Sequence, residues 1–207
     1  MASVRLRLGA VRGPPGVACL VCGSAIAVDG CHVSCCAPGP SYRGHDEVRD
    51  RLLELARLGD SHAEKETTGL LPAAPGRRPA DVLTSAACGR GLVALDVGIA
   101  SPDSQAGIAA GDALEAMRTR KVNEYRGLEA DLRAADLSYT PLPWSCWGRE
   151  HPDTTKILEA LCRRAARHRG DASWRSVLRS FRADVGAILA RRLSAMWRQC
   201  TFATAQA

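Results

Sequence analysis

Two aspartates in the middle of the chain have the residue type and spacing of a divalent-cation site. Asp81 opens one short predicted strand and Asp96 lies within the next, with 14 residues between them. An aspartate among apolar residues in mid-strand is costly to bury unless it is paired or holds a metal. If the two strands form a hairpin, both carboxylates lie near one edge of the sheet. The small neighbours Ala94 and Gly98 would then leave room there for Mg²⁺, Mn²⁺ or a phosphate. In the alternative, Asp81 caps a turn and Asp96 pairs with an arginine.

Lys121 is the third candidate, because it interrupts the apolar stripe of a predicted helix. It is one of three lysines among 28 basic residues. The stripe recurs every three or four residues and consists of Leu114, Met117, Lys121, Tyr125, Leu128 and Leu132. A lysine on the face that meets the sheet must reach water, a carboxylate or a phosphate. We therefore expect Lys121 to approach the two aspartates. The alternative is a lysine at the edge of the stripe whose ammonium reaches solvent.

A second group of potential ligands lies near the N-terminus, where five of the nine cysteines fall within 18 residues. Cys19 and Cys22 form a Cys-x2-Cys pair, and His32 and Cys36 form a His-x3-Cys pair. Two such pairs can close around one tetrahedral Zn²⁺, and with all four positions filled the site would be structural. Cys35 competes with Cys36 for the fourth position. The alternative is a loop of free thiols, since the odd cysteine count argues against a disulfide framework.

The elements that would position these residues follow from hydrophobic periodicity and turn signals. We divide the chain into a flexible tail (1–18), a CCHC zinc knuckle (19–44), a core (45–150) and basic C-terminal helices (151–200). Helices are predicted over 45–58, 105–135, 154–167 and 173–199, and strands over 63–71, 80–84, 92–100 and 137–144. Gly111 and Gly127 could fray or kink the second of these helices. This order predicts an α/β (α+β) fold with an α-β-β-β-α-β core and a mixed sheet. No apolar run approaches 18 residues, so no membrane span is expected.

The basic residues indicate an anionic partner. The chain has a formal net charge of +6, and residues 155–200 hold eleven basic residues against three acids. Six arginines there are candidate DNA contacts: Arg163, Arg164, Arg167, Arg175, Arg179 and Arg182. The alternative is a solvated helical face in an arginine-rich chain. Trp144 and Trp147 could stack on bases, but we expect them to pack in the core.

Together these residues resemble the restriction-enzyme-like endonuclease domain of site-specific non-LTR retrotransposons, which belongs to the PD-(D/E)XK nuclease superfamily. That family places a Cys-Cys-His-Cys knuckle ahead of an Arg/Lys-Pro-Asp motif, a second Asp, and a helix with Lys and Tyr. The knuckle is matched by Cys19, Cys22, His32 and Cys36, the first motif by Arg78, Pro79 and Asp81, the second acid by Asp96, and the helix by Lys121 and Tyr125.

Two further similarities and three departures complete the comparison with this family. The stretch 43–50 is similar to the family's first helix, and Glu66 is similar to an accessory acid of the superfamily. Ala80 is inserted into the first motif, and Gly98 stands where the superfamily usually has lysine. The chain also holds nothing that resembles the reverse transcriptase to which these domains are normally joined.

The resemblance implies a restriction-endonuclease-like fold and a nuclear, metal-dependent DNA endonuclease that nicks one strand. Asp81, Asp96 and Glu66 would hold Mg²⁺ or Mn²⁺, and Lys121 would orient the attacking water or stabilise the transition state. DNA is the expected partner, with a reverse transcriptase or a retroelement RNA–protein complex as a second. The alternatives are a catalytically inactive, zinc-containing nucleic-acid-binding module and a protein-interaction domain that uses the last helix. An arginine-containing N-terminus also leaves an organelle presequence open.

Overall fold

A computed structural model of the chain describes residues 17–26, 31–36, 41–72, 74–88, 91–170 and 173–201. Of the tail expected over 1–18, only its last two residues belong to these ranges. The element order is helix α2 (Cys31–Cys35), helix α3 (Ser41–Arg57), three strands, three short helices, a fourth strand and two long helices. This order confirms the predicted α/β class with its mixed sheet, N-terminal Cys/His cluster and C-terminal helical pair.

The sheet has four strands in the order β1-β2-β3-β4. The strands are β1 (Glu64–Lys65), β2 (Val82–Thr84), β3 (Leu92–Ala100) and β4 (Leu137–Ser145). The first three are antiparallel neighbours, whereas β4 runs parallel to β3. A parallel pair needs a crossover connection, which here consists of α4 (Gln105–Ala110), α5 (Ala113–Glu124) and α6 (Glu129–Ala134).

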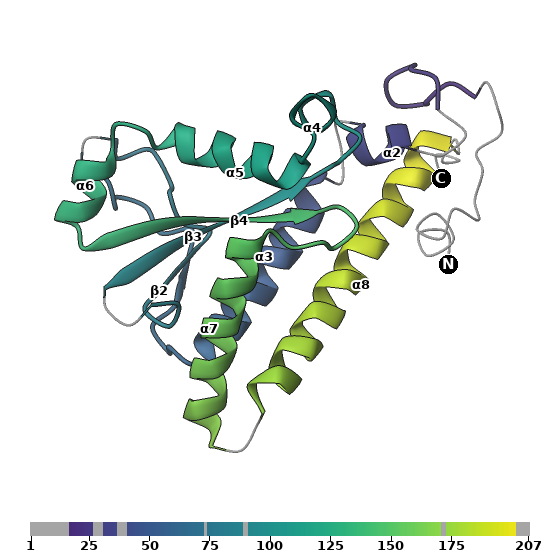
Figure 1. Cartoon of the computed structure of the whole chain (residues 1–207). Helices are drawn as coiled ribbons and strands as arrows, with labels where there is room; N and C mark the ends of the chain where they lie inside the picture. The colour runs from purple at the N-terminus through teal and green to yellow at the C-terminus, as the bar shows by residue number, and fades with distance from the viewer. Residues whose placement is uncertain are drawn as a thin grey trace, which may run out of the picture.

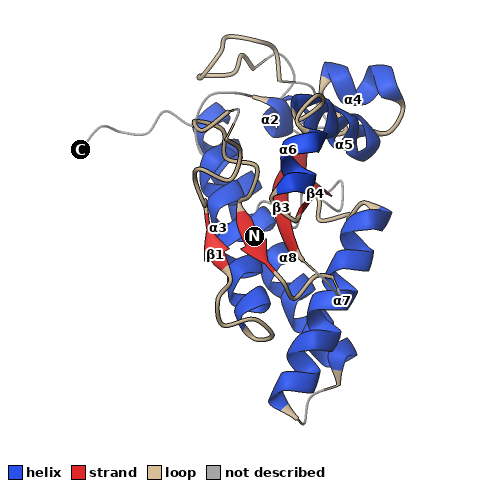
Figure 2. Cartoon of the chain, turned by 90° about the vertical axis from the view of Figure 1, so that its left-hand side faces the viewer, coloured by secondary structure: helices blue, strands red, loops and turns tan. Residues whose placement is uncertain are grey.

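Helices cover both faces of the sheet because side chains alternate along β3. Val93, Leu95 and Val97 belong to the main core, together with residues of α3, α7 (Pro152–Arg169) and α8 (Trp174–Thr201). Ala94 lies in a smaller cluster with residues of α6. Figure 1 shows α5 above the sheet and α7 and α8 below it. Figure 2 shows α4, α5 and α6 gathered at one end and α7 extending away from them. Asp96 is two residues from Ala94 along β3, so its side chain lies on the same face of the sheet and faces α5.

The single helix expected over 105–135 is wrong, because the segment folds as three helices. Gly111 adopts φ 70° at the end of α4, a left-handed conformation that ends the helix. Asp112 then caps α5 by accepting a hydrogen bond from the Leu114 amide at 2.9 Å. Tyr125 follows the last residue of α5 and is still buried, and its hydroxyl donates to the Arg78 carbonyl at 3.0 Å. The stripe therefore faces the sheet, but on two helices instead of one.

The boundaries of the other elements differ from the expected ones in a few places. The strand expected over 63–71 is only Glu64–Lys65, because Glu66 has φ 51° and leaves the extended region. Helix α3 begins four residues before the expected position, at Ser41. The expected strand over 92–100 is confirmed as β3, and α7 and α8 lie within two residues of their predicted limits.

The C-terminal helices complete the core. Phe181 and Leu189 of α8 are fully buried against α3 and α7. Trp144 is also fully buried, which confirms its predicted place in the core. At its far end α8 lies beside α2 (Figure 1). Among the described helices, none is both long and apolar enough to cross a bilayer.

Candidate functional site

Asp81 is held against β3 just before β2 begins. Its amide donates to the Leu95 carbonyl at 3.0 Å, and its Oδ2 accepts from the Val97 amide at 2.7 Å. Val82 is the register partner of Leu95. The same antiparallel register continued by one residue places Asp81 opposite Asp96, as the hairpin hypothesis expects.

His45 of α3 is the second partner of Asp81. Its Nε2 donates to Asp81 Oδ2 at 3.1 Å and also lies 3.2 Å from the Val97 carbonyl, while its Nδ1 faces Asp46 at 3.3 Å. The hydrogen bond to Asp81 raises the pKa of His45 above its ordinary value. Burial alone would raise the pKa of Asp81, but the hydrogen bond and charge of His45 outweigh it and the pKa is lowered. This pair therefore favours a carboxylate beside an imidazolium.

Asp96 has two partners from opposite sides. Lys121 of α5 donates from Nζ to Asp96 Oδ1 at 2.6 Å, and the Tyr139 hydroxyl of β4 donates to Oδ2 at 2.5 Å. The side chains of Asp96 and Lys121 are only 15% and 12% exposed. Burial raises the pKa of Asp96, and the negative charge of Asp81 adds to this effect, while Lys121 and Tyr139 oppose it. Burial and the Asp96 charge likewise raise the pKa of Tyr139.

These five groups form what we call the acidic centre: His45, Asp81, Asp96, Lys121 and Tyr139. The charge of Lys121 also lowers the pKa of Asp81, so the two aspartates and the lysine belong to one electrostatic cluster. The structure thus brings together the three residues that the sequence singled out as chemical candidates. An arginine partner for Asp96, the alternative, does not occur among its described contacts.

Gly98 has a different role from the expected one. A Cβ built on Gly98 would lie 2.8 Å from Lys121 Cε and 2.9 Å from Met117 Cγ. The space that was expected to admit an ion is therefore filled by the aliphatic part of the lysine. The missing side chain allows Lys121 to lie across β3 and reach Asp96.

The backbone of Glu66 lies next to the acidic centre, but its carboxylate points to other partners. Its amide donates to the Asp81 carbonyl at 3.1 Å. Its Oε1 accepts from Arg49, a buried residue of α3, and Oε2 lies 3.9 Å from Arg78. The Glu66 carboxylate is therefore engaged in ion pairs with Arg49 and Arg78. The structure does not show this carboxylate as a third candidate ligand beside Asp81 and Asp96.

The acidic centre has the donor types that a hard divalent cation prefers. Among the described contacts, Asp81 Oδ1 has no hydrogen-bond partner, so this oxygen can accept a ligand bond. Both Asp96 oxygens already accept hydrogen bonds, but each carboxylate oxygen has a further lone pair. Two carboxylates with water in the remaining positions suit Mg²⁺. The residues present therefore fit the expected cation.

Sequence reasoning did not select His45 or Tyr139 as members of the centre. Tyr139 had a usable signal: in the parallel register it pairs with Ala94, two residues before Asp96 on the same face of β3. His45 lies in the stretch 43–50 that resembles the family's first helix, but nothing in the sequence indicates its contact with Asp81, because α3 lies far from β2 and β3 in the chain. Its contact depends on the way α3 packs across the sheet.

The Cys/His cluster is formed by Cys19, Cys22, His32 and Cys36, whose ligand atoms all lie within 4.8 Å of one another. The Sγ atoms of Cys19 and Cys36 are 3.7 Å apart, and Cys22 Sγ is 3.3 Å from His32 Nε2. Tetrahedral zinc with Zn–S bonds of about 2.3 Å places its sulfurs about 3.8 Å apart. The cluster could therefore bind a metal such as zinc.

Cys36, and not Cys35, is the fourth member of the Cys/His cluster, because the Cys35 thiol lies beside another partner. Cys35 Sγ lies 3.1 Å from the Ser101 hydroxyl. Burial raises the pKa of Cys36. Burial also acts to raise the pKa of Cys19, but hydrogen bonds from the Cys22 and Val21 amides lower it to about 7. Cys19 is thus already close to the thiolate form that metal binding needs.

The end of α8 covers this cluster, which the sequence did not reveal. Met196, Trp197 and Cys200 are buried against Cys19 and Cys36, and Trp147 packs at the edge. The Leu20 amide donates to the Cys200 carbonyl at 3.0 Å. Trp147 is therefore engaged in packing, as expected.

The six arginines proposed to contact DNA are all exposed on α7 and α8, but they differ in their partners. Arg163 pairs with Glu159 at 2.7 Å, and Arg182 binds both oxygens of Glu150. Arg163 and Arg175 also stack on Trp174. Three of the six line a cavity of about 420 Å³: Arg163, Arg164 and Arg167.

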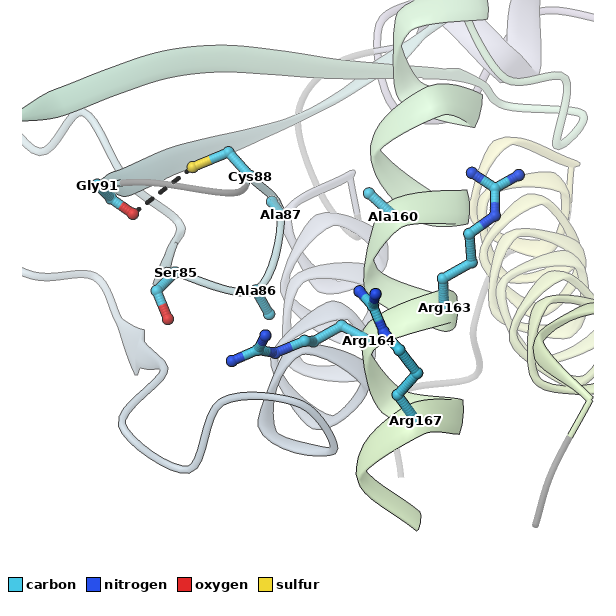
Figure 3. A pocket seen from close by; sticks show the side chains of 9 residues that line it. All are labelled: Ser85, Ala86, Ala87, Cys88, Gly91, Ala160, Arg163, Arg164 and Arg167. Atoms are coloured by element: carbon cyan, nitrogen blue, oxygen red, sulfur yellow. Dashed lines mark hydrogen bonds between the residues drawn. The ribbon is translucent and has the colours of Figure 1, made fainter. Parts of the chain in front are cut away.

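Figure 3 shows that these three arginines do not converge on one point. Arg164 extends toward the loop at Ser85, whereas Arg163 turns toward the other side of α7. Arg164 also donates to the Gly59 carbonyl at 3.3 Å. The cavity is thus a basic surface feature without a single focal point for an anion.

Comparison with known proteins found no matching family model, no matching curated protein and no matching solved structure.

Proposed function

We propose that the chain is a metal-dependent DNA endonuclease that hydrolyses a phosphodiester bond and nicks one strand. The observation that carries this proposal is the pairing of Lys121 with Asp96 beside Asp81 on the neighbouring strand. Burying two carboxylates and an ammonium together has no evident benefit for stability, since buried ion pairs are often no better than apolar packing. Titratable groups that are perturbed by burial and by specific charge partners cluster at functional sites.

Two further features support the proposal. The α-β-β-β-α-β order and the Cys/His cluster ahead of it agree with the resemblance to retrotransposon endonuclease domains. The exposed arginines of α7 and α8 offer phosphate contacts that position DNA without reading its sequence. DNA in the nucleus is the proposed substrate, and a reverse transcriptase or retroelement RNA–protein complex is the proposed partner.

In this mechanism Asp81 and Asp96 would hold Mg²⁺ or Mn²⁺, which when bound would supply positive charge at the scissile phosphate and a more acidic water. Lys121 brings a positive charge next to Asp96, where it stabilises the charge that develops on the phosphoryl oxygens. Tyr139 fixes the plane of the Asp96 carboxylate through its hydroxyl. His45 and the Val97 amide hold Asp81 Oδ2, so that Oδ1 is the oxygen that can accept a ligand bond. Glu66 has no place in the mechanism unless it leaves Arg49.

The test is relaxation of supercoiled plasmid in Mg²⁺, in Mn²⁺ and without divalent cation. We expect nicking that depends on Mg²⁺ or Mn²⁺ and is lost in Asp96→Asn. Asp112→Asn is the matched control, because Asp112 is a half-exposed aspartate that caps α5 outside the centre, and asparagine caps equally well. Equal nicking by both variants would exclude the proposal.

One observation favours a second candidate, a nucleic-acid-binding module without activity. Both oxygens of Asp96 are engaged by groups of the chain itself, as they would be in a centre that has lost its cation. Tight plasmid binding without nicking in any divalent cation would select this candidate. Binding of neither DNA nor RNA would instead favour a protein-interaction domain.

A further inference from the structure

A cavity of about 680 Å³ lies beside the acidic centre and reaches α8. It shares His45, Gly98 and Lys121 with the centre and its surroundings, and it is also lined by Arg120 and Arg192. None of the described residues that line it is an aspartate or a glutamate. The cavity is therefore electropositive, and its volume is in the range of small-molecule sites.

Arg192 is the unusual residue in this cavity. It lies one residue from the exposed Arg191 but turns inward, so that its Cδ is 2.3 Å from a Cβ built on Gly44 of α3. Its Nε and Nη1 atoms are buried and have no hydrogen-bond partner. No acid pairs with it among the described residues, and burial lowers its pKa. Only a glycine at position 44 permits this close approach.

Two buried guanidinium nitrogens without hydrogen-bond partners destabilise the free protein, because their desolvation is not compensated. Arginine retains its charge in such surroundings, so an anion would both supply the missing acceptors and balance the charge. The planar guanidinium binds phosphate through two parallel hydrogen bonds. Lys121 borders the same cavity, so one ligand can contact both Arg192 and the acidic centre.

We propose that Arg192 binds a phosphate of the nucleic-acid strand next to the one that is cleaved, with the cavity holding the intervening nucleotide. This inference rests on the proposed endonuclease function and deepens it by assigning a second phosphate subsite. The basic cavity on α7 is not equivalent, because its arginines diverge and are partly paired.

The experiment compares Arg192→Met with Arg191→Met. The two variants remove the same charge from adjacent residues of α8, but Arg191 is 64% exposed and paired with Glu47. Binding of a duplex oligonucleotide is measured without Mg²⁺ and without chelator, so that any zinc remains bound. We expect Arg192→Met to raise the Kd about tenfold or more, as for the loss of a hydrogen bond to a charged group, and Arg191→Met to change it about twofold or less.

Melting temperature gives the second readout. Arg192→Met is expected to melt at a higher temperature than the parent, because it removes an uncompensated buried charge and keeps an apolar chain over Gly44. Arg192→Lys, which keeps the charge but not the two parallel donors, is expected to lose DNA affinity without this gain. A lower melting temperature for Arg192→Met together with unchanged DNA affinity in both variants would overturn the inference.

Inorganic phosphate distinguishes the source of the ligand. If phosphate alone raises the melting temperature of the parent but not of Arg192→Met, while DNA affinity is equal in both, the site binds free phosphate and the nucleic-acid assignment is wrong. Nicking is scored separately. If DNA binding depends on Arg192 but the protein does not nick, the phosphate subsite is upheld and the nuclease function is refuted. If Arg192→Met nicks and binds DNA as the parent does, the nuclease function is upheld and the phosphate subsite is refuted.

Discussion

The acidic centre and the Cys/His cluster are both candidate metal sites, but they are neutralised in opposite ways. In the acidic centre, Lys121 and His45 supply positive charge to the two carboxylates. In the cluster, Cys19, Cys22 and Cys36 have no such counter-charge among their described contacts, and His32 is the only nitrogen ligand. The centre therefore keeps its geometry without a cation. The cluster contains thiols that repel one another once they ionise, unless a metal holds them.

The two regions also differ in what supports them. Asp96 lies on β3, which is paired on both sides, and Asp81 is hydrogen-bonded directly to that strand. The four ligands of the cluster come from a turn, from the five-residue helix α2 and from Cys36 just after it, with α8 as the main neighbour. We infer that metal binding organises the cluster but only completes the acidic centre.

The largest expected effect separates chemistry from binding in the acidic centre. Lys121→Met keeps the aliphatic contact with Gly98 and removes the ammonium. Loss of one transition-state stabiliser lowers a rate by about 10²–10³. DNA affinity should change little, with the salt slope falling by at most about one unit. Nicking rates and salt-dependent binding check this. Nicking within a few-fold of the parent would show that Lys121 only packs.

The next largest effect is expected from removing the metal from the Cys/His cluster, and this effect should appear in the stability of the protein. Purified protein is expected to contain one zinc, and Cys22→Ser to contain much less. A metal present at 100 times its Kd stabilises by about 2.7 kcal/mol, which for this chain length is about 5–10 °C in melting temperature. Elemental analysis, melting curves and tryptophan fluorescence near Trp197 report the loss. Asp96→Asn should retain its zinc, and a zinc content that falls equally in both variants would contradict the comparison.

A smaller effect is expected from the arginines outside both regions. Arg175 and Arg179 of α8 have no described acidic partner, unlike Arg163 and Arg182. Changing Arg175 and Arg179 to Gln should lower the salt slope of DNA binding by about one unit each. The same change at Arg163 and Arg182 should lower it less, because each already pairs with a glutamate. Fluorescence anisotropy at several salt concentrations measures the slopes. Equal slopes for the two pairs would show that these ion pairs do not limit DNA contact.

The smallest effect concerns Asp60, a carboxylate neutralised by hydrogen bonds alone. It accepts bonds from the Ser85 amide at 2.7 Å and the Thr84 hydroxyl at 2.9 Å. Burial acts to raise its pKa, but these donors outweigh it and the pKa is lowered. The stabilisation is therefore present above the unfolded pKa of about 3.9 and is lost as the pH falls through the lower folded value. Asp60→Asn should lower the free energy of unfolding by about 1 kcal/mol at pH 7 and by less at pH 3. Denaturant unfolding measures both, and a difference independent of pH would contradict this account.

The pattern of apolar residues predicted more of the fold than of the site. Strand β3 is apparent in the sequence because Val93, Leu95 and Val97 alternate with smaller residues, and α8 because its apolar stripe is long. A kink or fraying at Gly111 was expected, but the complete end of the helix there was not, since a glycine within a periodic segment can be tolerated or can end a helix. The context of Asp112, which caps the next helix, decides between these outcomes.

The site was predicted where one strand or one helix fixes it, and missed where distant segments meet. Asp81 and Asp96 follow from hairpin geometry, and Lys121 from its place on a buried face. Glu66 was expected to join them on family resemblance, but its carboxylate pairs with Arg49 and Arg78. Arg192 was counted only among the eleven basic residues of 155–200, because periodicity does not show that Gly44 leaves a space for it.

The contact between the Cys/His cluster and the end of α8 has a consequence for the order of events during synthesis. Cys19 is translated about 180 residues before Cys200, which at about 5–20 residues per second is roughly 10–40 s. Throughout this interval the thiols emerge without the apolar cover that Met196 and Trp197 later provide. Early capture of a metal would protect these thiols from oxidation until that cover forms. We therefore expect the yield of intact protein to depend on zinc supply while the chain is being made, and not on zinc added after release.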